Sequence, residues 1–333
     1  MRRLLLLGGV VLLVWASVVV PIPLAVAVPV PATPLPEVVE VDGPGVDHLD
    51  ERFRFTAVRL EEPTIAGAVV TLFDEQRALS PLPTITAPGA DEDTFARFQE
   101  ALFVESLTVA VAVALDRAGE QVTISGGGAR VLEVLPTTAA ADELQREDVI
   151  TALDGEPVEL ASDLATRLDA VDAGTEVEVT YERDGEENTT RLPVAPTDEL
   201  ADEVASLAIG VFATTVDLEL TAPVDVDVTA PEGVGGPSAG LLLALAAYDA
   251  ATGGSLAGDR VVAGSGTIDA EGRVGRVDGI PQKVQGAIDA GAEVFLVPAV
   301  AGGDAARAAA DGALEVIEVE DLDGAIDALG TDA

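Results

Sequence analysis

Lys283 is the residue of this chain whose side-chain type points most directly to chemistry. It is the sole lysine among 333 residues, and every other basic side chain is an arginine. A guanidinium stays protonated near neutral pH, whereas an ammonium group in apolar surroundings can lose its proton and act as a base. A lysine that persists by chance on a solvated helix face would look the same in isolation, so the surrounding sequence must decide.

Ser238 is the candidate nucleophile that such a base could activate. It lies in residues 235–240, Gly-Gly-Pro-Ser-Ala-Gly, which open an apolar helix predicted over residues 241–247. Glycine lets a backbone approach closely, proline presets the first helical turn, and the amides of a helix N-terminus favour a developing oxyanion. An N-cap serine after a glycine turn is the alternative explanation.

The residues around Ser238 also match Gly-x-Ser-x-Gly, the nucleophile elbow of α/β-hydrolases. That mechanism needs a histidine after the serine, but the single histidine, His48, precedes it. A Ser-His-Asp triad is therefore excluded. Lys283 follows on a predicted helix, where Ile280 and Val284 should help to bury it. A neutral lysine could take the serine proton and return it to a leaving amine, as in Ser-Lys dyads.

The composition restricts the partners and cofactors of this pair. There are 59 acidic and 18 basic residues, giving a formal charge of −41, which disfavours nucleic acid and anionic lipid. We attribute the dispersed acidic residues to adaptation to high salt, where screening shortens the range of self-repulsion. The absence of cysteine rules out disulfides and Cys-ligated zinc, and one histidine cannot build a multi-histidine metal site. We expect no cofactor.

The N-terminal residues predict a transmembrane anchor over residues 1–30. Leu4 to Val20 carries no charge and, with residues 21–30, is long enough to span a bilayer. Two arginines precede it, so the N-terminus is expected to be cytoplasmic and the catalytic domain extracellular on a single-pass protein. A cleaved signal peptide is the alternative, because residues 25–27, Ala-Val-Ala, resemble a cleavage site. The apolar run is longer than a usual signal core, which favours the anchor.

The spacing of apolar, glycine and proline residues predicts an α/β (α+β) chain beyond the anchor. Residues 31–118 combine a stiff, extended proline-rich linker with a strand over 52–60, a helix over 65–79 and a long helix over 93–118. Residues 119–196 form a β-rich module, and residues 197–333 alternate strands with helices.

The β-rich module carries a specific resemblance. Its matching segments are Val131 to Val134, Ala139-Ala140, Glu147 to Ile150 and Leu153 to Gly155. They resemble a PDZ domain of bacterial envelope proteases, which binds an extended chain end as an added strand beside one helix. The resemblance places the groove between residues 122–124 and a helix over 162–171. The expected lining residues are Val122, Ile124, Leu164 and Leu168. A structural module with a vestigial groove is the alternative.

The last part of the chain resembles the proteolytic domain of Lon-type serine peptidases. The matching segments are residues 236–240, 263–268, 271–274, 279–283, 291–292 and 295–298. The resemblance implies Ser238 as the nucleophile and Lys283 as the base. Ser265 matches a hydroxyl position that hydrogen-bonds near the lysine, and Gly236 and Ala239 are expected to support the oxyanion.

Together with the anchor and the PDZ-like module, nearly the whole chain is similar to membrane-anchored, PDZ-containing Lon-like serine proteases. No Walker A Gly-Lys step exists, because Gln282 precedes the only lysine, so we expect a protease that does not use ATP. Its partners would be unfolded or exposed protein segments, and the resemblance implies a homo-oligomer such as a hexamer. A non-catalytic PDZ/Lon-like scaffold of the cell envelope is the alternative, although it would need a degraded dyad and both members are present.

Overall fold

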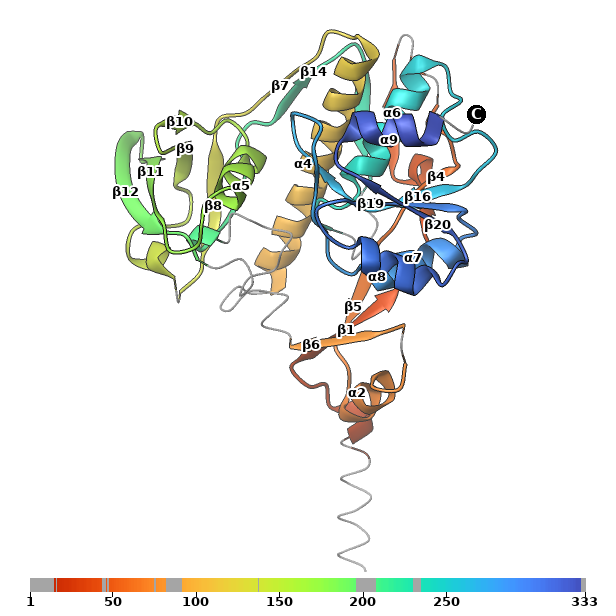
Figure 1. Cartoon of the computed structure of the whole chain (residues 1–333). Coiled ribbons are helices and arrows are strands. Elements are labelled where there is room, and N and C mark those ends of the chain that lie inside the picture. The colour runs from red at the N-terminus through yellow and green to blue at the C-terminus, as the bar shows by residue number, and fades with distance from the viewer. Residues whose placement is uncertain are drawn as a thin grey trace, which may run out of the picture.

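The computed structural model describes residues 15, 17–43, 46, 48–74, 76–81, 92–136, 138–195, 208–229 and 235–330. Figure 1 shows three parts: a small N-terminal module at the base, a large mixed body above it, and a β-rich module at the side of the body. The α/β (α+β) prediction is confirmed, because helices pack on sheets in the body and a separate antiparallel sheet forms the side module.

The central sheet of the body joins strands from both ends of the chain. Its order is β2 (Thr33–Pro34), β4 (Phe53–Phe55), β16 (Val262–Gly264), β19 (Val294–Pro298), β20 (Glu315–Val319). β4 and β19 both pair parallel with β16. The two phenylalanines of β4 lie on the same face of the strand, and both are buried. β4 lies within the strand predicted over 52–60, whereas β2 lies in the segment predicted as an extended linker, so the linker prediction is wrong at β2.

Helices cover the central sheet. They are α4 (Glu92–Ala118), α6 (Gly240–Thr252), α7 (Ile280–Asp289), α8 (Gly303–Ala310) and α9 (Leu322–Gly330). α6 is apolar on all sides and almost wholly buried, and α4 packs along it. The prediction of a long helix over 93–118 is confirmed. By length and composition, residues 96–118 could cross a membrane, but most of that stretch is buried inside the protein, as in a core helix.

The β-rich module is a five-strand path with its own apolar core. The order is β12 (Glu186–Pro193), β11 (Glu176–Arg183), β9 (Val149–Leu153), β8 (Ala129–Val134), β13 (Val211–Thr215), and β10 (Glu156–Pro157) pairs with β9. α5 (Ala161–Asp169) packs against this sheet. The expected module boundary at residue 196 lies outside the described residues, and β13, beyond it, completes the sheet.

Two short ladders tie the parts together. β7 (Thr123–Ser125) pairs with β14 (Glu219–Thr221), and β3 (Val39–Asp42) pairs with β15 (Asp225–Val228). Apolar residues of both ladders pack in the same core as α4 and α6. The β-rich module is consequently an insertion between segments that belong to the body.

The N-terminal module differs from its prediction. β1 (Leu24–Pro29) lies between β5 (Val58–Glu61) and β6 (Ala78–Pro81) in an antiparallel sheet, with α2 (Ile65–Thr71) beside it. An anchor extending to residue 30 and a helix extending to residue 79 are both wrong. Pro21 and Pro23 lack the amide hydrogens that a continuing helix needs, and Asp74 begins a polar turn that ends in β6. Residues 1–14 and 16 of the predicted anchor lie outside the described residues.

Candidate active site

Ser238 lies in the turn that leads into α6. The residue before the first helical position is Ala239, and Gly236 has a φ of 83°, a conformation that favours glycine. Ser238 is 9% exposed, so its side chain is almost completely buried. This position agrees with the prediction that Ser238 lies at the N-terminus of an apolar helix.

α4 holds this turn from one side. The amide of Gly236 donates to the carbonyl oxygen of Gln99 at 3.0 Å, and Ser106 Oγ donates to the carbonyl oxygen of Pro237 at 2.8 Å. The approach is so close that a Cβ on Gly240 would lie 2.8 Å from Ser106 Oγ. Because Ser106 is itself buried, its hydrogen bond fixes the backbone directly before Ser238.

The contribution of α4 was not predicted from the sequence. Ser106 follows Glu105 inside an otherwise apolar stretch of the helix, and both are buried in the structure. A buried polar pair within an apolar helix normally has specific hydrogen-bond partners, so this pattern was a usable signal. The partners themselves could not be named, because the serine turn is far away in the sequence.

Ser265 holds the same turn from the other side. The carbonyl oxygen of Ser238 accepts from the amide of Gly266 at 2.9 Å and from Ser265 Oγ at 3.3 Å. Ser265 is fully buried and follows β16 directly. The structure thus brings Ser265 and Ser238 into contact, through the backbone of the serine.

Lys283 lies in the first turn of α7 and is only 4% exposed. Its neighbours Ile280 and Val284 are buried in an apolar cluster, as the sequence predicted. α7 lies between the parallel strands β16 and β19 in the chain, so it must run back along the sheet. Its N-terminus is therefore at the carboxyl ends of those strands, which is the edge where Ser265 meets Ser238.

One predicted role of the turn glycines is wrong. The amide of Gly236 is already bound to Gln99 on α4, so it does not point to a reacting oxyanion. Within the described ranges, the amide of Ala239 has no hydrogen-bond acceptor, and Ala239 is buried next to Ser238. Of the two predicted oxyanion residues, only Ala239 keeps a donor for that purpose.

The predicted peptide groove is also placed differently. Val122 and Ile124 pack against the body core, and β7 pairs with β14 rather than lying beside α5. Leu164 and Leu168 of α5 are fully buried in the core of the β-rich module. The edge strand beside α5 is β13, whose Thr215 Oγ1 accepts from the amide of Ala161 at 2.8 Å. The sequence did not reveal β13 as a strand, which is why the groove was assigned to the wrong edge.

Glu105 connects α4 to this edge. Its buried carboxylate accepts from the amide of Ser162 at 3.0 Å, in the first turn of α5, and from the amide of Thr215 at 3.4 Å, on β13. A carboxylate at a helix N-terminus is favoured by the free amides there. Adjacent residues of α4 therefore contact the serine turn and the β-rich module.

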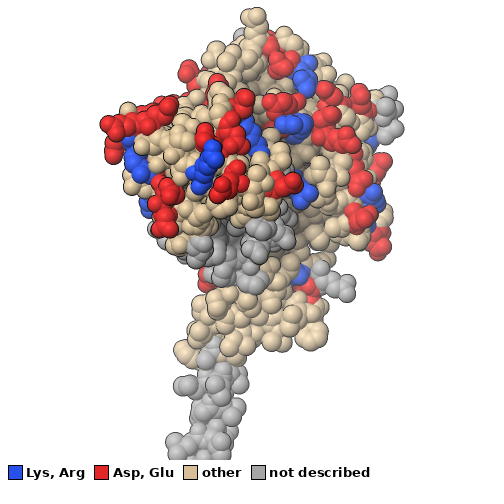
Figure 2. Space-filling view, turned by 60° about the vertical axis from the view of Figure 1, so that its left-hand side comes forward, with Lys and Arg blue, Asp and Glu red and all other residues tan. Residues whose placement is uncertain are grey.

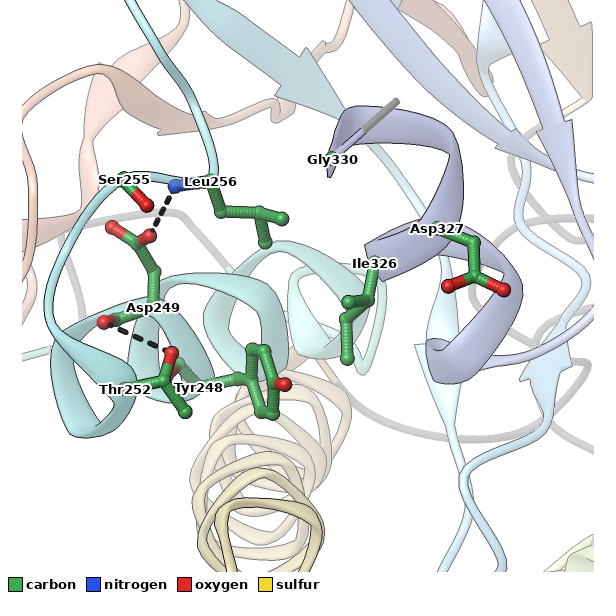
Figure 3. A pocket seen from close by; sticks show the side chains of 8 residues that line it. All are labelled: Tyr248, Asp249, Thr252, Ser255, Leu256, Ile326, Asp327 and Gly330. Carbon is green, nitrogen blue, oxygen red and sulfur yellow. Dashed lines mark hydrogen bonds between the residues drawn. The ribbon is translucent and has the colours of Figure 1, made fainter. Parts of the chain in front are cut away.

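A pocket at the opposite end of α6 is unrelated to the serine turn. Figure 3 shows Tyr248, Asp249 and Leu256 on one side and Ile326 on the other. α6 has 13 residues, which places the pocket about 20 Å along the helix from Ser238. Asp249 accepts from the amide of Leu256 at 2.6 Å, and burial raises the pKa of its carboxyl. This carboxyl has a structural role as the acceptor that closes the loop after α6.

Among the described residues, no group of His, Cys, Asp and Glu side chains is arranged to hold a metal ion. Figure 2 shows acidic side chains spread over the face of the body and the β-rich module. Many are interleaved with arginines in ion pairs such as Arg183–Asp148 and Arg273–Asp269. The surface is acidic as a whole and has no basic patch on this face.

Comparison with known proteins decides between the chemistries that such a serine turn allows. The C-terminal proteolytic domain of Lon protease (S16) matches residues 202–329, and a PDZ domain matches residues 111–194. The chain belongs to the PDZ-containing Lon-like proteases. This Lon-like protease is accordingly a serine protease with a PDZ module, and β13, outside the matched PDZ residues, is the strand that completes that module.

Several solved structures are similar to about a fifth to a quarter of this Lon-like protease. A solution structure of a Geobacillus thermodenitrificans protein is 33% identical, covers 21% of this chain and 79% of its own, and gives a TM-score of 0.20. The PDZ domain of an SdrC-like protein from Listeria monocytogenes is 20% identical, with 26% and 86% coverage and a TM-score of 0.22. The second domain of a Listeria innocua protein is 21% identical, with 27% and 84% coverage and a TM-score of 0.22. A search of the curated proteins found no match.

Proposed function

We propose that this protein is an ATP-independent, membrane-tethered endopeptidase that cleaves unfolded or exposed protein segments with a Ser238–Lys283 dyad. The observation that carries the proposal is the position of the two side chains. Ser238 is fixed between α4 and Ser265, and the buried Lys283 lies in the first turn of α7 at the same edge of the central sheet. Lys283 is also the only lysine in the sequence.

In the proposed reaction, neutral Lys283 accepts the Ser238 proton as Oγ attacks the carbonyl carbon of the scissile peptide bond. The amide of Ala239 donates to the oxyanion that forms. Lys283 then gives the proton to the leaving nitrogen as the C–N bond breaks, and an ester remains on Ser238. Water attacks this ester with Lys283 as the base, which releases the acid and restores the hydroxyl.

Two substitutions test the dyad in the full-length protein. We expect Ser238→Ala and Lys283→Arg each to abolish hydrolysis of an unfolded protein in molar salt without nucleotide, because arginine keeps the charge but cannot act as a base. Ser255→Ala, an exposed serine beyond the far end of α6, is the matched control and should keep full activity. Hydrolysis that survives either dyad substitution would reject the mechanism, and an inactive wild-type protein would favour the scaffold function.

We propose that the PDZ module recruits substrates through the edge of β13 beside α5. An extended chain end can add to an exposed edge strand through main-chain hydrogen bonds. β13 is the last strand of its sheet, and α5 packs next to it. Residues 211–213 are buried and the amide of Thr215 is bound by Glu105 of α4, so a substrate strand would have to replace this contact with α4. An unfolded substrate with a free C-terminal carboxylate should be cleaved faster than the same substrate with a C-terminal amide. Equal rates would argue against recruitment by the chain end.

The tether consists of the charge-free N-terminal residues, with the N-terminus in the cytoplasm and the proteolytic domain outside the cell. The position of β1 supports an uncleaved anchor. Ala25 and Val26, within the candidate cleavage segment, are buried in the middle strand of the N-terminal sheet, so cleavage after Ala27 would remove four of the six residues of that strand. Assembly into a homo-oligomer such as a hexamer is a further part of the proposal, and light scattering on the purified protein would measure it.

A further inference from the structure

The N-terminal module exposes a cluster of large apolar side chains. We call it the α2 patch: Ile65, Val69, Val70, Leu72 and Phe73, which are 50%, 51%, 63%, 70% and 86% exposed. In the described part of the chain, the other strongly exposed large apolar residues are concentrated at Leu60 and residues 15–20, and only Val104 and Val300 lie elsewhere. Apolar side chains gathered in this way mark a contact surface rather than the usual scatter of single residues.

The α2 patch lies beside the exposed apolar residues Val18 to Val20. Thr64, which caps α2, forms a β-bridge with Pro21, and the amide of Ile22 donates to the carbonyl oxygen of Pro63 at 3.0 Å. Val18 to Val20 directly precede this bridge. Figure 1 shows α2 at the base of the molecule, below the sheet of β1, β5 and β6. The patch and residues 18–20 therefore form neighbouring apolar surfaces at this base.

The charge distribution around the α2 patch favours a lipid surface over a soluble protein as its partner. Residues 63–73 contain no ionisable side chain, in a chain whose formal charge is −41. Figure 2 shows a largely uncharged N-terminal module below an acidic body. A soluble partner would be expected to complement this acidic body with basic groups, whereas a lipid surface with uncharged headgroups needs only the apolar contact. The acidic residues Glu61, Glu62 and Asp74 at the rim of the patch disfavour anionic headgroups.

We propose that the α2 patch lies in the interfacial region of a bilayer with uncharged headgroups, as a second membrane contact next to the anchor. This inference rests on the tethering proposed above. Short apolar elements of this kind are buried about 5–10 Å into the boundary between headgroups and acyl chains. Because α2 is joined to the sheet of β1, β5 and β6, the contact fixes the orientation of the body relative to the membrane, which a single helix alone would leave free to rotate.

Depth-dependent fluorescence quenching tests the inference in the full chain. The single tryptophan is removed by Trp15→Phe, and Phe73→Trp places a reporter in the patch. The protein is reconstituted into phosphatidylcholine vesicles with bromine on the acyl chains. We expect its emission to be quenched, and more strongly by bromines near the headgroup end than by bromines near the chain end. Val300→Trp in the same background is the control, since Val300 is exposed on the body, and its emission should not change.

Flotation of the vesicles separates the possible outcomes. If the protein does not float with the vesicles, the tether fails and this inference fails with it. If it floats and the reporter at position 73 is not quenched, the tether stands and the inference is overturned. A blue-shifted but unquenched emission would mean that a second copy of the chain covers the patch, which also overturns it.

Discussion

Ser106 is the residue whose loss should separate positioning from chemistry. Its hydroxyl fixes the carbonyl of Pro237, next to Ser238, and does not reach the reacting atoms in the proposed mechanism. A small displacement of a nucleophile can cost up to about 100-fold in rate. We expect Ser106→Ala to lower kcat by about 10- to 100-fold with little change in KM. Labelling of Ser238 by a fluorophosphonate should slow in parallel.

Thr108→Ala is the matched control for Ser106. Thr108 lies on the same helix, is exposed, and donates only to the carbonyl oxygen of Val104 in its own helix. It should keep wild-type kcat and labelling rate. If both variants behave alike, the bond from α4 to the serine turn has no role in positioning.

Asp249 gives a prediction on pH and stability. Burial raises the pKa of this carboxyl above its usual value of 3.8, so the folded state holds the proton more tightly than the unfolded state. Its contribution to the free energy of unfolding therefore falls as pH rises above about 4 and through the raised pKa. Asp249→Asn keeps an acceptor for the Leu256 amide (Figure 3) and removes this titration.

The measurement for Asp249 is the free energy of unfolding in urea between about pH 4 and 7. The difference between the variant and the wild type should increase in favour of the variant over this range. A difference that stays constant with pH would mean that the carboxyl does not titrate differently in the folded state. Asp50, whose pKa is lowered by its hydrogen bond with Arg52, acts in the opposite direction and is unchanged in both proteins.

At the scale of single residues, the sequence predicted which side chains form the candidate site better than it predicted their hydrogen-bond partners. Ser238 and Lys283 were chosen from their sequence context and from the rarity of lysine, Ser265 from the resemblance to Lon-type peptidases, and all three are buried. The amide of Gly236 was assigned to the oxyanion, yet it binds α4. Hydrogen bonds between segments so distant in sequence depend on tertiary packing, which side-chain type alone does not encode.

At the scale of elements, α4 is the part that joins the PDZ module to the proteolytic domain. Glu105 binds amides of α5 and β13, and its neighbour Ser106 binds the serine turn. We expect Glu105→Ala to lower the free energy of unfolding by about 1–3 kcal/mol, because two amides lose a buried acceptor. Hydrogen exchange at Ser162 and Thr215 should accelerate.

Glu100→Ala is the control for this prediction, since Glu100 is an exposed acidic residue on the same helix. Its effect on stability should be within about 0.5 kcal/mol. Unchanged exchange at Ser162 and Thr215 in Glu105→Ala would show that the carboxylate does not hold these amides in solution.

The helices were predicted more successfully than the strands. α4 was predicted from apolar residues at helical spacing over many turns, and α7 from the residues around Lys283. A strand was predicted over 52–60, where the structure has β4 and β5, but the pairing of β4 with β16 could not be predicted from local sequence. β13 has five residues and does not present enough alternation to be distinguished from a loop. The way in which strands combine into the two main sheets was therefore the least predictable feature of the fold.

At the scale of the whole molecule, the formal charge of −41 should control stability. Like charges repel over about 10 Å in 0.1 M salt and over about 3 Å in 1 M salt. We expect the melting temperature to rise steeply between low salt and molar salt, measured by calorimetry, because the folded state relieves less repulsion than the unfolded chain at low salt. Sucrose at matched osmolality is the control, and it should give a smaller rise. A melting temperature that does not depend on salt would contradict adaptation to high salt.

The position of β4 has a consequence for the timing of proteolysis. This strand is near the start of the chain, whereas its partner β16 follows the whole PDZ module and the serine turn. Strands that are so far apart can pair only after most of the polypeptide has been synthesised. A nascent or truncated chain thus has no complete central sheet to support Ser265, and a cell that makes this protein is protected from its proteolytic activity until synthesis of the chain is nearly finished.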